Sequence, residues 1–198
     1  MRKPTTVAAL TELGRVRLSK SFFMRDMLHS EIAQVHGLLN APDKPELAIE
    51  VGTRLAEELL EPLQERFGPM RIRSAYRSPE VNQLGWEMRS AGKDEYACAS
   101  NEYNAARHIW DQLDTSGCKG ATACVVLPAF YDMHPEEGSW QVLARWIDRH
   151  INYSSVQFYP TYWAFNIQWH ERPVRTIDSF AEPKGRWSAG IGIGEHCC

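Results

Sequence analysis

The longest regular pattern of apolar positions lies in residues 46–66. Its apolar residues recur every four positions, at Leu47, Val51, Leu55, Leu59 and Leu63. Residues at this spacing share one face of a helix, and Glu and Arg fill the positions between them. The pattern therefore predicts a long amphipathic helix whose apolar face lies in the core, ended by Gly68-Pro69.

Weaker patterns predict two more helices. Residues 21–39 bring Phe23 and Met27 to one helical face, and residues 139–150 form an amphipathic helix. The inward positions of the second are Trp140, Leu143, Ala144 and Ile147. Residues 1–20 are predicted as an extended lead-in, and the polar residues 86–104 as an irregular insertion with one short helix.

Strand patterns are found mainly in the second half of the chain. Residues 105–112 and 119–128 are predicted as two strands joined by a turn at 114–117, and residues 154–159 and 163–169 as a hairpin around Pro160. The Pro- and Gly-punctuated remainder from Arg172 is predicted as a tail. Helices followed by an antiparallel sheet with one inserted helix indicate an α+β fold.

Composition limits what kind of protein this is. The 198 residues fit one domain, predicted at 21–180 between the lead-in 1–20 and a tail 181–198. A formal net charge of −3 gives no reason to expect nucleic acid as a partner. No apolar run reaches the length of a membrane span, and Val7–Leu10 is too short for a signal peptide. We therefore expect cytoplasmic synthesis, with release to a cell wall only by a phage-type or other signal-independent route.

Candidate chemistry appears first in residues 70–79, MRIRSAYRSP. Ile72 lies between two arginines in a short strand pattern, and Ser78-Pro79-Glu80 has the form of a helix N-terminus. The predicted strand end carries Arg73, Ser74, Tyr76 and Arg77 next to that N-terminus. Such a place suits an anionic or carbonyl group, so these residues are predicted to bind substrate, with Arg77 directly at the reaction site.

With its surroundings, this stretch resembles the zinc D-alanyl-D-alanine carboxypeptidases, their phage endolysin relatives and the hedgehog signalling domain. The matching segments are residues 22–40, Leu60-Glu61-Pro62-Leu63, Phe67-Gly68, and Ser74–Pro79 with Asn82. The resemblance implies a hedgehog/DD-peptidase-like α+β fold in which N-terminal helices pack on a small antiparallel sheet. It also implies one catalytic zinc ion and a peptide or peptidoglycan-like substrate whose stem peptide ends in D-Ala.

The family binds zinc through two histidines and an aspartate. Trp169-His170 matches the late histidine motif, and His108 resembles the first histidine. The family's aspartate follows seven residues after that histidine, where this chain has Thr115. Asp111 or Asp114 supplies the carboxylate if the hairpin is longer, and Cys124 supplies a thiolate in the other possible arrangement. Strand parity favours Asp114, because it is an even number of residues from His108.

A second departure from the family concerns the general base. The relatives place an acid a few positions before the late histidine, whereas residues 163–169, WAFNIQW, contain none. Glu171 is the nearest acid and is the predicted general base. Two hypotheses follow: a zinc peptidase in which Arg77 binds a substrate carboxylate or stabilises the oxyanion, and a non-catalytic binding protein on the same fold whose metal site is lost or structural.

Overall fold

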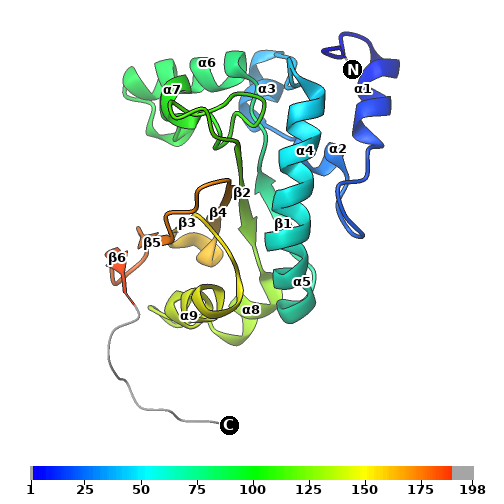
Figure 1. The fold of residues 1–198 in the computed structure, drawn as a ribbon. Coiled ribbons are helices and arrows are strands. Elements are labelled where there is room, and N and C mark those ends of the chain that lie inside the picture. The colour runs from blue at the N-terminus through cyan, green and yellow to red at the C-terminus, as the bar shows by residue number, and fades with distance from the viewer. Residues whose placement is uncertain (1, 189–198) are drawn as a thin grey trace.

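The computed structural model describes residues 2–188, which form an α+β fold with one six-stranded sheet (Figure 1). The helices are α1 (Val7–Gly14), α2 (Met24–Met27), α3 (Glu31–His36), α4 (Pro45–Leu55), α5 (Glu61–Phe67), α6 (Pro79–Ser90), α7 (Asn101–Asn104), α8 (Pro128–Met133) and α9 (Trp140–His150). Short π or 3-10 turns are η1 (Ala56–Leu60), η2 (Asp94–Tyr96) and η3 (Thr161–Trp163). The strands are β1 (Arg71–Ser74), β2 (Gly120–Val126), β3 (Ser155–Phe158), β4 (Phe165–His170), β5 (Thr176–Ser179) and β6 (Gly185–Trp187).

The sheet has the strand order β1-β2-β4-β3-β5-β6. All neighbours are antiparallel except β3 and β5, so the sheet is mixed and the prediction of a purely antiparallel sheet is wrong. The predicted β3–β4 hairpin is confirmed, with Val156 opposite Ile167. The residues after Arg172, predicted as a tail, instead supply β5 and the edge strand β6. Residues 189–198 of the predicted tail 181–198 lie outside the described residues.

The predicted long helix is confirmed as the continuous run α4–η1–α5, which lies along the sheet (Figure 1). Val51, Leu55, Leu59 and Leu63 are fully buried in the main core. The indole N–H of Trp169 in β4 donates to a carboxylate oxygen of Glu58 at 2.9 Å, which ties the π turn to the sheet. The predicted inward face of α9 is also confirmed, since Trp140, Leu143, Ala144 and Ile147 are all buried.

The N-terminal predictions are only partly right. Of the lead-in predicted over 1–20, residues 2–20 are not simply extended: Thr6 caps α1, and Leu13 and Leu18 are buried in the main core. The single helix predicted over 21–39 is divided into α2 and α3, because Ser30 accepts a hydrogen bond from the Ala33 N–H and begins a new helix. In the predicted insertion 86–104, α6 continues to Ser90 and is followed by η2 and α7.

Candidate functional site

The candidate site lies on the face of the sheet turned away from α4. Alternate residues of a strand point to opposite faces. Ala121, Ala123 and Val125 of β2 belong to the main core. The residues between them therefore point to the other face, which we call the second face; it carries Thr122 and Cys124 from β2, and Asn166, Gln168 and His170 from β4. The helices α6 and α7 lie at one end of the sheet, and α8 and α9 at the other (Figure 1).

A cavity of about 420 Å³ opens where β4 ends on the second face. It is lined by residues of α7 and the segment after it, by the turn at 114–115, and by the residues around the end of β4. These are Ser100, Glu102, Tyr103, Ala105, Arg107, Asp114, Thr115, Ser154, Gln168, His170, Arg172 and Val174. Two of the four predicted metal ligands, Asp114 and His170, are therefore in its wall.

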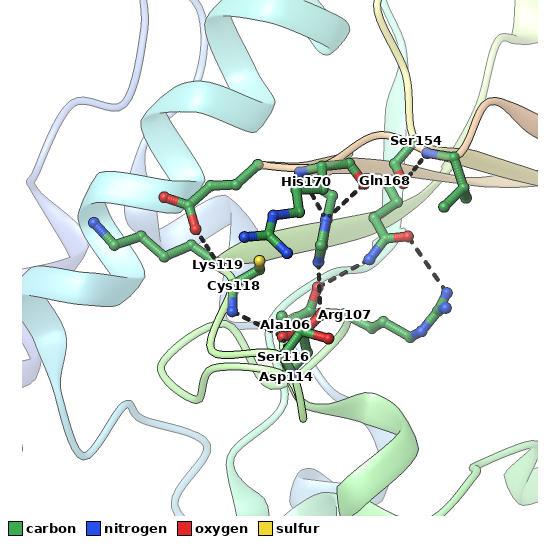
Figure 2. A network of polar contacts seen from close by, with 12 residues as sticks. Ala106, Arg107, Asp114, Ser116, Cys118, Lys119, Ser154, Gln168 and His170 are labelled. Atoms are coloured by element: carbon green, nitrogen blue, oxygen red, sulfur yellow. Dashed lines mark hydrogen bonds and ion pairs between the residues drawn. The ribbon is translucent and has the colours of Figure 1, made fainter.

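Asp114 and His170 contact each other directly, as Figure 2 shows. His170 Nε2 is 3.1 Å from Asp114 Oδ2, and the other carboxylate oxygen accepts hydrogen bonds from the N–H groups of Cys118 and Ser116. The backbone bond from Cys118, then that from Ser116 and the contact with His170, lower the pKa of Asp114. His170 Nδ1 accepts a hydrogen bond from the N–H of Arg172 at 3.0 Å. Both ring nitrogens are thus engaged, and the pair fastens the 114–118 turn to the end of β4.

His108 has a different role. Its Nδ1–H donates to the carbonyl of Ala75 at 2.8 Å, and only 6% of the residue is exposed. Burial, followed by the positive charge of Arg77, lowers the pKa of His108 to about 3. The imidazole is therefore neutral at ordinary pH and joins the segment after α7 to the strand end after β1.

Asp111 is a structural carboxylate as well. Its side chain is buried and accepts hydrogen bonds from the N–H groups of Asp43 and Lys44, at 2.7 and 3.2 Å. The Tyr76 hydroxyl donates to its other oxygen at 3.1 Å. Burial and the Asp111 charge raise the pKa of Tyr76. Tyr76 itself is fully buried, so this predicted substrate-binding residue lies in the core and not on the second face.

His108 and Asp114 do not share the face of a strand, so the prediction from residue parity is wrong. Residues 105–112 form no strand; only an isolated bridge joins Ala105 and Ile109, and Ala106 has a positive φ of 55°. The segment turns back on itself beside β2, where the Thr122 N–H donates to the Arg107 carbonyl. Gly120 permits this approach, since a Cβ there would lie 2.3 Å from the Ala106 carbonyl oxygen. Residue parity carries no information about side-chain direction in such a turn.

The donor set does not fit a three-ligand zinc site of the kind that the resemblance implies. Asp114 and His170 are together, but His108 and Asp111 are used elsewhere, and residues 2–188 contain no group of three His, Cys, Asp or Glu side chains that could hold a metal ion. Cys124 pairs with Asn166, whereas His170 pairs with Gly120. Four residues of strand separate these pairs, roughly 14 Å. Burial also raises the pKa of the Cys124 thiol to about 11, so the thiolate arrangement is not assembled either.

The remaining predicted residues are spread over the second face and its edges. Arg77 is half-buried, and its guanidinium donates to Cys98 Sγ at 3.2 Å and to Asn82 Oδ1 at 3.4 Å. Arg73 is exposed at an irregularity between Ile72 and Ser74, and Ser74 lies opposite Cys124. Glu171 accepts a hydrogen bond from the Lys119 N–H at 2.7 Å, so the predicted general base fastens the start of β2.

Sequence reasoning missed the residues that shape the cavity most. Arg107 lies with its guanidinium carbon 4.6 Å above the Tyr103 ring. Its Nη1 is 3.4 Å from the Gln168 side-chain oxygen, a contact that Figure 2 shows. Arg107 lies in residues 105–112 and Gln168 in residues 163–169, both predicted as strands, so the sequence did not indicate that the two side chains meet. The one available signal was the position of Arg107 directly before His108.

Comparisons with known proteins do not assign this chain to a family. No family model, curated protein or solved structure matches this chain. Within residues 2–188, no helix combines the length and apolar character that crossing a membrane requires.

Proposed function

We propose that this chain is a binding domain with a hedgehog/DD-peptidase-like fold that holds a peptide-like ligand bearing a carboxylate and does not cleave it. One observation supports this proposal above the others. The residues that correspond to the family's zinc ligands and general base are engaged in internal contacts: His108 with Ala75, Asp111 with Tyr76, and Glu171 with Lys119.

His170 does not supply the proton acceptor that hydrolysis needs. The basic nitrogen of His170 already accepts the Arg172 N–H, and its other nitrogen faces Asp114. A general base needs a free lone pair within hydrogen-bond reach of the proton that it removes. The arrangement therefore favours binding over turnover.

The carboxylate is assigned to Arg77 and Arg73. Burial raises the pKa of Cys124 to about 11 and that of Tyr159 to about 12, and the positive charges of both arginines oppose the rise. Arg73 lies in β1 directly before Ser74, which pairs with Cys124 of β2, and Arg77 follows three residues after Ser74. Among residues 2–188 neither arginine forms an ion pair with an acid. A guanidinium without an acidic partner suits a ligand carboxylate, which it can bind through two parallel hydrogen bonds.

Calorimetric titration with a tripeptide ending in D-Ala-D-Ala tests this function. We expect binding that weakens at least tenfold when the peptide is C-terminally amidated, and equally in Arg77→Gln. Arg145→Gln, on the exposed side of α9, is the matched control and should bind as wild type does. Mass spectrometry of the same samples, with zinc added, should recover the peptide intact. Equal binding of the amidated peptide would remove Arg77 from the site.

The zinc peptidase is kept as a second candidate because two of its predicted ligands, Asp114 and His170, are 3.1 Å apart. Metal analysis of the purified protein separates the two functions. About one zinc per chain that is lost in His170→Ala, together with zinc-dependent cleavage of the tripeptide, would establish the enzyme and refute the binding domain. His170→Ala with wild-type metal content would remove His170 as a ligand.

A further inference from the structure

The cavity at the end of β4 is a separate candidate site from the arginines beside Cys124. Its lining includes Arg107, Arg172 and Glu102, none of which is assigned to the carboxylate site proposed above. Its volume of about 420 Å³ is near the lower end for small-molecule sites. Any occupant is therefore small, and the charges in the wall define which small molecule fits.

Arg107 is held in position before any ligand arrives. Its guanidinium rests on the Tyr103 ring at 4.6 Å and reaches the Gln168 side-chain oxygen at 3.4 Å. Gln168 is itself fixed, because its oxygen accepts from the Ser155 hydroxyl and its amide donates to the Ala106 carbonyl. Only 3% of Gln168 is exposed. A guanidinium oriented in this way binds an oxyanion with little loss of side-chain entropy.

The two acidic side chains that line the cavity, Asp114 and Glu102, differ in their contacts. Asp114 is committed to His170 and to two backbone N–H groups. Glu102 is exposed in α7 and, within the described chain, forms no ion pair with a cation. The cavity therefore offers a positive group, Arg107 with Arg172, and a negative group, Glu102. Such a wall complements a ligand that carries both charges.

The rim adds an apolar surface. Tyr103 is 60% exposed and Val174 is 66% exposed, and both line the cavity. One face of the Tyr103 ring is covered by Arg107, which leaves its edge and other face available. An apolar side chain placed between Tyr103 and Val174 would leave water, a favourable change of about 25 cal/mol for each Å² buried.

We propose that this cavity binds a free α-amino acid with an apolar side chain. Its carboxylate contacts Arg107, its ammonium group contacts Glu102, and its side chain contacts Tyr103 and Val174. The proposal stands independently of the peptide-binding function, because it uses none of the same side chains.

Calorimetric titration of the full chain with L-leucine and L-phenylalanine tests the proposal. The comparison ligands are L-leucinamide, which lacks the carboxylate, N-acetyl-L-leucine, which lacks the ammonium, and glycine, which lacks the apolar side chain. We expect L-leucine to bind at least tenfold more tightly than L-leucinamide and several-fold more tightly than the other two. Arg107→Gln should weaken L-leucine at least tenfold, and Glu102→Gln several-fold.

Two matched measurements make the result specific. Glu102→Gln should leave the affinity for N-acetyl-L-leucine unchanged, because that ligand has no ammonium to lose. Arg77→Gln should leave L-leucine binding unchanged, so a failure here is distinct from a failure of the peptide site. Thermal melts identify any loss of folding in Arg107→Gln. Glu102→Gln changes an exposed side chain, so it tests the site even if Arg107→Gln does not fold. The proposal would be overturned if neither amino acid gave a binding heat. It would also be overturned if glycine and inorganic phosphate bound as tightly as L-leucine.

Discussion

Acidification should destabilise this domain through one buried imidazole. His108 donates to the Ala75 carbonyl and has a pKa lowered to about 3, chiefly by burial and then by Arg77. In the unfolded chain its pKa is about 6.5. Below that pH the His108 imidazole binds a proton in the unfolded state but not in the folded state. The free energy of unfolding therefore falls as pH drops from about 6.5 towards about 3.

The size of the effect follows from linkage. Each pH unit between the two pKa values costs about 1.36 kcal/mol, so moving from pH 7 to pH 5 should remove about 2 kcal/mol of stability. This loss depends on the unfolded pKa alone as long as the folded pKa stays below 5. At pH 5 most carboxylates are still ionised, so they contribute little to the change in stability over this range.

Urea unfolding at pH 7 and pH 5, in EDTA so that no metal competes for the imidazole, measures the loss. His108→Gln keeps a hydrogen-bond donor but has nothing to titrate, so it should be less stable at pH 7 and lose about 2 kcal/mol less than wild type on acidification. His29→Gln, at an exposed position, is the control and should behave as wild type. Equal losses in wild type and His108→Gln would show that the imidazole is not buried in its neutral form.

Two further substitutions test the internal polar contacts. Asp111→Ala should lower the free energy of unfolding by about 2–4 kcal/mol, because it leaves the Tyr76 hydroxyl and the Asp43 and Lys44 N–H groups without their acceptor. Urea unfolding measures it, and a loss under 1 kcal/mol would contradict the structural role. Thr122→Val should be neutral or stabilise by up to about 1 kcal/mol, because the buried Thr122 hydroxyl has no hydrogen-bond partner within residues 2–188. A clear drop in melting temperature would show that this hydroxyl has a partner.

The elements with strong periodicity were predictable from the sequence. The face of Val51, Leu55 and Leu59 is buried as its spacing indicated, and α9 and the β3–β4 hairpin also follow their patterns. Ser78 and Pro79 begin α6 because a side-chain cap and a fixed φ act within one turn of chain. These features depend on interactions between residues close in sequence, and such interactions leave a local pattern.

The candidate site depended on tertiary contacts that leave no such pattern. His108 and Asp114 are separated because residues 105–112 fold as a turn against β2, where Gly120 admits the Ala106 carbonyl. β5 and β6 were missed because both strands are short, and β5 is fixed by parallel pairing with β3 and antiparallel pairing with β6. The sequence by itself determined the main helix, the hairpin and the α+β class. Only the tertiary structure decided that His108 and Asp111 satisfy buried backbone and hydroxyl groups, since a polar side chain buried in the fold must bind whichever partners the packing brings within reach.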